Sequence, residues 1–166
     1  TYYNPVFVYG AEAFARDAAN AGADGVLCVD LPPEEGSAYI AAMRAHELST
    51  VFLAAPTSSD ARLALIGDAC DTFAYYVSRL GVTGERAALE GHLRDAVTRV
   101  RDISGKPVAV GFGISTPDQA REVAGIAEGV VVGSAIVRLI AEHTGASDTP
   151  ARVAAFASAL ARAIKE

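Results

Sequence analysis

The stretch PVAVGFGISTPDQAREVAGIAEGVVVGSAI, residues 107–136, contains two short β-rich runs with a helical pattern between them. The two runs, at about 107–112 and 129–133, are apolar on both faces. Strands have this composition when helices cover both sides of a sheet, which is typical of parallel strands joined by crossover helices. The stretch therefore predicts a unit of strand, helix and parallel strand.

The helix inside this unit has a well-marked start. Thr116 fits the N-cap, Pro117 fits the first helical position, and Gln119 completes a capping box. Together these residues predict a helix over 117 to about 125.

The same alternation of strand and helix continues along the chain. Further strands are predicted at about 26–30, 50–55 and 72–77, each followed by a helical pattern. The opening TYYNPVF looks like the end of another strand, followed by the helix of GAEAFARDAANAGADG. Near the other end, Thr149 and Pro150 repeat the helix-start signal. They precede an apolar stripe that we expect to pack on the sheet, made of Val153, Phe156, Ala157, Leu160, Ala161 and Ile164.

This pattern predicts an α/β fold of the parallel-barrel type. A closed parallel barrel has eight strands and typically about 250 residues. We expect the 166 residues to form a single domain, 1–166, that covers roughly the last five strand–helix units of such a barrel plus the end of its third strand. An arc of this kind has open sheet edges, so the chain alone is expected to self-associate edge to edge.

Composition excludes several classes of function. The chain has a formal net charge of −6, which argues against binding to nucleic acid or to an anionic membrane surface. No apolar run approaches the roughly 20 residues of a membrane span. Cys28 and Cys70 form no CxxC motif and are expected to be reduced thiols in a cytoplasmic protein. The three histidines have no metal-ligand spacing, so no metal site is predicted.

Glycine turns follow three of the predicted strands. They are GVTG at 81–84, GFGIST at 111–116 and GSAI at 133–136. Glycine lets backbone N–H groups approach an anion closely, and a helix N-terminus favours negative charge. In parallel barrels the phosphate site is frequently built from the loops after the last two strands and a short extra helix. We therefore predict that Gly113, Gly133 and Ser134 offer donors to one phosphate, although each turn alone is also consistent with a simple connection.

The stretch SRLGVTGER, residues 78–86, is interpreted as a lid. Its glycines allow it to move, while Thr83, Gly84 and the arginines close over an anionic ligand and exclude water. The alternative is an exposed basic loop without such a role.

Six segments together resemble one protein family over essentially the whole chain. They are TYYNPVFVYG, DGVLCVDLPPEE, FLAAPTSSDARLALI, YYVSRLGVTGER, GFGISTPDQA and GVVVGSAIV, in this order. The chain resembles the alpha subunit of bacterial tryptophan synthase, a (β/α)8 TIM barrel. That family cleaves indole-3-glycerol phosphate to indole and glyceraldehyde 3-phosphate in tryptophan biosynthesis. It passes indole to a beta subunit in an alpha2-beta2 assembly, and pyridoxal phosphate is expected only in that partner, with no cofactor in this subunit.

The resemblance implies roles by position. Phosphate binding is implied for Gly84, Gly113, Gly133 and Ser134. The implied lid and pocket residues are Arg79, Thr83, Tyr75, Phe112, Tyr2, Val29 and Leu53. The implied partner face contains Asn4, Asp30 and Pro32, with Asp30 as the residue that carries signals across it.

The family's catalytic carboxylates have no counterpart among these 166 residues. Its glutamate lies in a segment resembling ELGxPFSDP on the second strand, and its aspartate lies in the loop that follows. No catalytic residue is therefore assigned, and the isolated chain is predicted to be inactive or nearly so. The other carboxylates near strand ends are expected to cap helices or to be solvated, and these are Asp30, Asp60, Glu34, Glu35 and Glu85.

Two other functions are consistent with the residues. The turns GFGI and GSA also suit a phosphate-binding barrel that acts as a sugar-phosphate isomerase or epimerase. The loops DLPPEEGSAY and AAPTSSD also suit a non-catalytic module that holds a beta-type partner.

Overall fold

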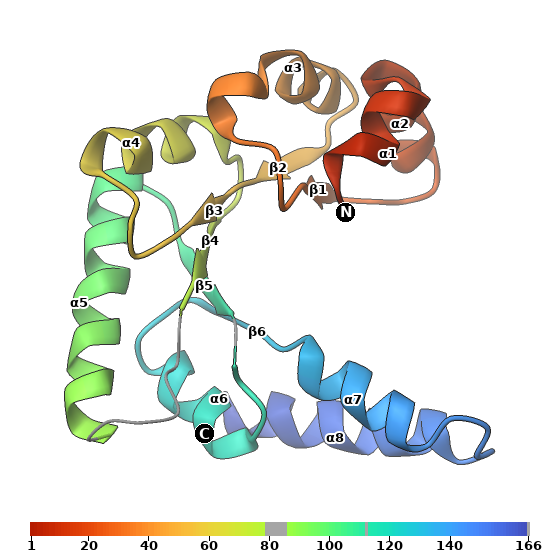
Figure 1. Ribbon diagram of the computed structural model, residues 1–166, viewed down its shortest axis with the longest axis vertical. Helices are drawn as coiled ribbons and strands as arrows, with labels where there is room; N and C mark the ends of the chain where they lie inside the picture. The colour runs from red at the N-terminus through yellow and green to blue at the C-terminus, as the bar shows by residue number, and fades with distance from the viewer. Residues whose placement is uncertain (79–85, 112, 166) are drawn as a thin grey trace. The chain divides into compact units, whose positions relative to one another are not determined.

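The computed structural model describes residues 1–78, 86–111 and 113–165, and for residues 86–90 it describes the backbone alone. Short strands alternate with helices along the chain (Figure 1). The chain divides into two units. Unit 1 comprises Thr1–Tyr75 and Thr98–Pro107, and unit 2 comprises Tyr76–Val97 and Val108–Glu166.

Unit 1 begins with two helices and continues with alternating strands and helices. Its elements are α1 (Tyr3–Tyr9), α2 (Ala11–Asn20), β1 (Gly25–Leu27), the 3-10 helix η1 (Pro33–Glu35), α3 (Ser37–Ala45), β2 (Ser49–Val51), β3 (Leu53–Ala54) and α4 (Asp60–Ala69). Strands β1 and β2 are parallel, with Gly25 paired to Ser49 and Leu27 to Val51. The parallel pairing agrees with the crossover arrangement predicted from the sequence.

Two elements contribute residues to both units. They are β4 (Ala74–Val77) and α5 (Arg86–Ser104). Hydrogen bonding gives the strand order β3-β4-β5-β6. In unit 1 the Tyr75 N–H donates to the Phe52 carbonyl at 3.0 Å, and in unit 2 the Ser78 N–H donates to the Gly111 carbonyl at 3.1 Å.

The core of unit 1 is built from large side chains of α3, α4 and the segment between β2 and β3. Tyr39 and Phe52 are fully buried, and their rings meet edge to face with centroids 6.4 Å apart. Gly67 of α4 lies so close to the backbone of Ser104 that a Cβ at position 67 would collide with the Ser104 carbonyl. A side chain of any size is therefore excluded at position 67.

Unit 2 contains the strand–helix–strand unit predicted from residues 107–136. Its elements are β5 (Val108–Gly111), α6 (Pro117–Ala124), β6 (Gly129–Val131), α7 (Ser134–Glu142) and α8 (Thr149–Ala163). Strands β5 and β6 are parallel, with Ala109 paired to Gly129 and Gly111 to Val131. The capping box is present at the start of α6, where the Gln119 N–H donates to the Thr116 hydroxyl at 3.2 Å. Both predictions for this segment are confirmed.

Three details differ from the sequence expectations. Residues 3–7 of the opening stretch lie in helix α1 rather than in a strand, because Val6 is buried and the Tyr3 N–H has a side-chain acceptor. Only Thr1 has strand-like hydrogen bonds: its amino group donates to the Leu27 carbonyl at 2.8 Å, and its own carbonyl accepts from the Val29 N–H at 3.1 Å. The expectation of a strand end therefore holds for that residue alone.

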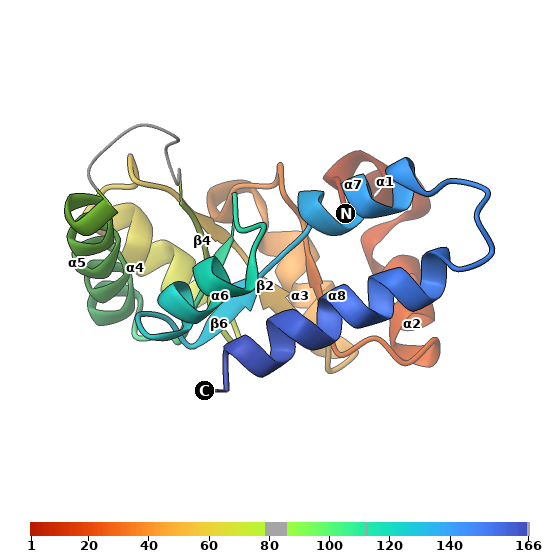
Figure 2. The ribbon, with the colours of Figure 1, turned by 90° about the horizontal axis from the view of Figure 1, so that it is seen from below.

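The other two differences concern strand continuity and the last helix. The run at 50–55 forms two strands, β2 and β3, separated at Phe52. Thr149 is the first residue of α8 rather than its N-cap, and its hydroxyl donates to the His143 carbonyl at 2.5 Å. The main packing partners of α8 are α6 and α7 rather than the sheet (Figure 2). The side chains that α8 buries are Leu160 and Ala163.

Candidate functional site

Gly113 and Gly133 follow the carboxyl ends of strands β5 and β6, at the same end of this strand pair in unit 2. Gly111 of β5 is the partner of Val131 of β6, and Gly113 and Gly133 each follow two residues after this pair. Because the two strands are parallel, their carboxyl ends lie side by side. The turns predicted to share one ligand therefore start from neighbouring positions.

Helix α7 begins directly at one of these turns. Gly133 is its N-cap and Ser134 its first residue, and both are exposed. The N–H groups of a helix's first turn have no acceptor within the helix, so those of Ser134 and Ala135 are directed to a ligand or to water. A Cβ at Gly133 would meet no described atom within 4 Å, so packing against the described residues does not require glycine there.

The turn after β5 has a specific backbone conformation. Gly113 has a φ of +86°, in the left-handed region that strongly favours glycine. Ile114 beside it is buried and anchors the loop. The Gln119 side chain holds the rest of the turn, because its Oε1 accepts from the Ser115 N–H at 2.8 Å and from the Thr116 N–H at 3.2 Å.

A small cavity of about 230 Å³ joins this turn to α7. Ser115 and Ala135, each two residues after its glycine, both line it. Its other lining residues are Arg138, Leu139, Glu142 and Phe156. The cavity brings the loop after β5 and the first turns of α7 to one place, with the Arg138 cation among its walls.

The residues expected around an indole ring form two local pairs in unit 1. Tyr2 follows Thr1, whose carbonyl accepts a hydrogen bond from the Val29 N–H at 3.1 Å, and the Tyr2 and Val29 side chains are 66% and 45% exposed. Leu53 of β3 and Tyr75 of β4 lie on hydrogen-bonded strands, and both are half-buried. Burial raises the pKa of the Tyr75 phenol, so this hydroxyl is neutral at physiological pH.

The residues expected to face a partner meet at the start of α1. The Asp30 Oδ1 accepts a hydrogen bond from the Tyr3 N–H at 2.7 Å, which ties the loop after β1 to the turn that carries Asn4. Pro32 follows in the same loop and is half-buried. Phe7 and Val8 of α1, which the sequence did not single out, are 68% and 78% exposed. Neighbouring large apolar side chains that are exposed mark candidate contact surfaces, and only the structure shows that these two are exposed.

Most other carboxylates near strand ends have structural roles. Asp60 forms an ion pair with Arg99, whose Nε lies 3.0 Å from its Oδ1. Glu34 forms an ion pair with Arg62 at 2.8 Å. Glu35 is exposed. Asp60 and Glu34 therefore form surface ion pairs rather than helix caps, and Glu35 agrees with the solvated role expected from the sequence.

Four predicted site residues lie outside the described residues, namely Arg79, Thr83, Gly84 and Phe112, together with Glu85 and the central part of the predicted lid. Cys28 and Cys70 are free, buried thiols. Burial raises the pKa of the Cys70 thiol to about 11. Among residues 1–78, 86–111 and 113–165, no cluster of three potential metal ligands is found, and no helix there has the length and apolarity to cross a membrane.

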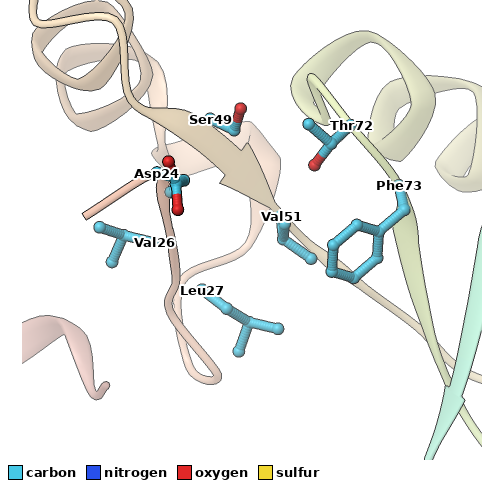
Figure 3. A pocket seen from close by; sticks show the side chains of 8 residues that line it. Asp24, Val26, Leu27, Ser49, Val51, Thr72 and Phe73 are labelled. Atoms are coloured by element: carbon cyan, nitrogen blue, oxygen red, sulfur yellow. The ribbon is translucent and has the colours of Figure 1, made fainter. Parts of the chain in front are cut away.

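A second cavity, in unit 1, is not a candidate for this site. It has a volume of about 370 Å³ and lies beside the first residues of β1 and β2, lined by Asp24, Gly25, Val26, Leu27, Ser49, Val51, Thr72 and Phe73 (Figure 3). Sites in parallel barrels lie at the carboxyl ends of the strands, whereas Asp24, Ser49 and Thr72 are at or before the amino ends. None of the predicted site residues lines it.

The family model described as "Tryptophan synthase alpha chain" matches residues 1–165. The chain belongs to the tryptophan synthase alpha chain family. Curated relatives of that name include those of Geobacter sulfurreducens, 50% identical over 98% of this chain, and Opitutus terrae, 48% identical over 97% of it. The chain spans 61% and 59% of the lengths of these two relatives.

Solved structures of the family support the barrel fold. Tryptophan synthase subunit alpha from Legionella pneumophila matches with a TM-score of 0.88 and 36% identity, over 99% of this chain and 60% of that one. A chain of Mycobacterium tuberculosis tryptophan synthase matches with a TM-score of 0.85 and 40% identity, over 100% of this chain and 61% of that one. The predicted fold class is confirmed, and these matches do not favour the isomerase or the non-catalytic module.

Proposed function

We propose that this chain carries the phosphate-binding part of an indole-3-glycerol-phosphate lyase, the alpha subunit activity of tryptophan biosynthesis. The observation that supports it most is the pairing of Gly111 with Val131, two residues before Gly113 and Gly133, together with the start of α7 at Ser134. In this proposal the two glycine turns and the helix N-terminus at one sheet edge supply N–H donors to one phosphate ester. Membership of the family supports indole-3-glycerol phosphate as the ligand over another sugar phosphate.

The chemistry divides between binding and proton transfer. Cleavage of the bond between indole C3 and the glycerol side chain is a retro-aldol step. C3 takes a proton, the side-chain hydroxyl loses one, and the electrons of the broken carbon–carbon bond return to the indole ring. In this proposal Gly113, Gly133 and Ser134 hold the phosphate, with Gly84 as a further donor. Tyr2, Val29, Leu53 and Tyr75 contact the indole ring, Phe112 lies beside it, and Arg79 and Thr83 belong to the closing lid.

No side chain of this chain is assigned to the proton transfers. Asp30, Asp60 and Glu34 are already engaged by a backbone N–H or by arginines. Positioning without an acid and a base loses about 10²–10⁴ in rate for each group. We therefore propose that the 166 residues by themselves bind phosphate esters and release little or no indole.

A beta-type subunit is the proposed partner. The proposed face is the start of α1 and the loop after β1, with Asn4, Asp30 and Pro32, extended by the exposed Phe7 and Val8. Exposed apolar side chains beside polar groups are typical of protein interfaces. Pyridoxal phosphate belongs to that partner in this proposal. The reduced, buried thiols support a cytoplasmic location, where glutathione keeps cysteines reduced.

The experiment follows indole release and phosphate binding in the same preparation. With indole-3-glycerol phosphate and the 166-residue chain, we expect no indole above the background. With glycerol 3-phosphate, we expect shifts of the Gly113, Gly133 and Ser134 amide signals in an NMR titration. Robust turnover abolished by D30N or E85Q would reverse the assignment of no catalytic carboxylate, and a titration without shifts at these amides would reject the phosphate site.

A further inference from the structure

The Gln119 side chain makes more hydrogen bonds than a capping box needs. A capping box consists of the bond from the Gln119 N–H to the Thr116 hydroxyl and the return bond from the Thr116 N–H to Oε1, and both are present at 3.2 Å. The same Oε1 also accepts from the Ser115 N–H at 2.8 Å and from the Ser115 hydroxyl at 3.1 Å. The bonds to Ser115 extend beyond the helix into the glycine turn.

The segment that these bonds hold is the one next to Gly113. Ile114 is buried on one side of Ser115, and helix α6 begins on the other side. Glycine itself supplies little conformational restraint, because it tolerates a wide range of φ and ψ. The restraint on the turn after Gly113 therefore comes from burial of Ile114 and from the carboxamide of Gln119.

Ser115 also connects this restraint to helix α7. It lines the cavity of about 230 Å³ that Ala135 and Arg138 line from α7. Fixing Ser115 therefore fixes the wall of the cavity opposite the first turn of α7. A ligand that contacts both turns requires a fixed distance between them. A turn that is ordered before binding loses less conformational entropy when the ligand binds.

We propose that Gln119 is a positioning residue for the phosphate site, acting through Ser115 on the turn of Gly113. This inference rests on the proposed phosphate-binding function of Gly113, Gly133 and Ser134. Gln119 does not touch the phosphate. Its oxygen holds the Ser115 N–H and hydroxyl, so that the N–H groups of the preceding turn already point toward the anion before it arrives.

The test compares two variants at position 119 in the 166-residue chain. Q119M has a similar length and no strong acceptor, so it removes the bonds to Ser115 and Thr116. Q119E keeps an acceptor oxygen and is the other residue found in capping boxes. We measure the dissociation constant for glycerol 3-phosphate by NMR titration at 0.15 M salt, where the Debye length of about 8 Å limits repulsion by the added charge.

We expect Q119M to weaken binding about tenfold, because the bonds to Ser115 and Thr116 no longer order the turn before the ligand binds, and Q119E to weaken it no more than about threefold. S59A is the matched control. The Ser59 hydroxyl caps α4 by accepting from the Arg62 N–H at 3.3 Å, so its loss removes a helix cap of unit 1, whereas the turn of Gly113 belongs to unit 2. S59A is expected to leave the affinity unchanged.

The outcomes separate this inference from the proposed function. If the unsubstituted chain does not bind glycerol 3-phosphate, the proposed function fails. If it binds, three results would each show that the positioning role is wrong. They are binding of Q119M as tight as that of the unsubstituted chain, binding of Q119E as weak as that of Q119M, and a loss of affinity in S59A as large as that in Q119M. Should Q119M not fold, Q119N replaces it, because its side chain is one methylene shorter and its carboxamide cannot reach Ser115.

Discussion

The Asp30 carboxylate accepts a hydrogen bond from the Tyr3 N–H at 2.7 Å, although the two residues lie on different elements. Tyr3 is the first residue of α1, and its N–H has no acceptor within the helix. A carboxylate at this position satisfies that donor and interacts favourably with the helix dipole. The hydrogen bond therefore ties the loop after β1 to the N-terminus of α1.

Substitution of Asp30 tests this link. We expect D30A to lower the free energy of unfolding by about 1 kcal/mol, the usual cost of a lost helix cap. It is also expected to weaken binding of a beta-type subunit, because Asn4, Phe7 and Val8 are carried by the helix that it loosens. Chemical denaturation and calorimetric titration with the partner measure the two effects.

D30N separates the hydrogen bond from the charge. The asparagine oxygen accepts from the Tyr3 N–H, so we expect most of the stability to be retained. If D30N and D30A have the same stability, the hydrogen bond does not stabilise α1. If both bind the partner like the unsubstituted chain, Asp30 does not belong to the partner face.

The left-handed turn of Gly113 has a matched control in the same unit. Gly113 and Gly145 have nearly equal φ values of +86° and +84°. Alanine in this region costs about 1–2 kcal/mol, so G113A and G145A are expected to lose similar stability. Only G113A should weaken glycerol 3-phosphate binding, because Gly145 lies in the loop between α7 and α8. Equal affinities of the two variants would exclude Gly113 from the phosphate site.

The close approach of Gly67 to Ser104 predicts a large effect on stability. In G67A the new methyl group would overlap the Ser104 carbonyl, and its distance to the carbonyl carbon would be 2.8 Å. Backbone cannot yield as a flexible side chain does, so we expect a loss of about 3 kcal/mol. Gly91, in the interior of α5, has no described atom within 4 Å of its Cβ position, so G91A is expected to stabilise by about 0.5–1 kcal/mol. Thermal melts of the two variants should therefore shift in opposite directions.

Asp71 makes the stability of unit 1 depend on pH. Burial alone would raise the pKa of its carboxyl, but hydrogen bonds from the Thr50 N–H, the Thr50 hydroxyl and Arg44 outweigh burial and lower it from its usual 3.8. A carboxyl whose pKa is lower in the folded state stabilises the fold above its unfolded pKa. That contribution is lost as the pH falls from about 5 through the folded pKa.

D71N removes the titrating group and tests this dependence. We expect D71N to be about 1.5–3 kcal/mol less stable near pH 7, because charge-assisted hydrogen bonds are lost. Its stability should fall less steeply than that of the unsubstituted chain between pH 5 and pH 3 in urea denaturation, because the titrating carboxyl is absent. D118N is the control, since Asp118 is 77% exposed and pairs within its own helix with Arg121. Parallel pH profiles of D71N and the unsubstituted chain would contradict the assignment.

Self-association through a sheet edge is a further expectation. Strand β6 is last in the described order β3-β4-β5-β6, so its outer backbone groups are an edge for another strand. We expect the 166-residue chain to dimerise with increasing concentration in sedimentation velocity. V131K places a charge on this edge and should shift the chain toward monomer, whereas V137K, on exposed helix α7, should not. A monomer at every concentration would contradict the expectation. If V137K rather than V131K dissociates the dimer, the dimer contact lies on α7 and not on β6.

The sequence alone determined the features that depend on neighbouring residues. The capping box of Thr116 and Gln119 could be predicted because its partners lie three residues apart in the chain. The strand at about 107–112 could be predicted because an apolar run of this length between turn signals is typical of a buried parallel strand. The glycine turns were predicted for the same reason, since they directly follow such runs.

The tertiary structure decided what depends on residues far apart in the chain. The opening residues form helix α1 because Asp30, 27 residues later, accepts the Tyr3 N–H, and no local pattern contains that partner. Gly67 has to be glycine because of Ser104 on another helix. The parallel register that pairs Gly111 with Val131, at the ends of the strands before the two glycine turns, likewise comes from strand pairing. Local propensity is specified within a few residues, whereas packing and register are determined when distant segments compete for the same buried surface.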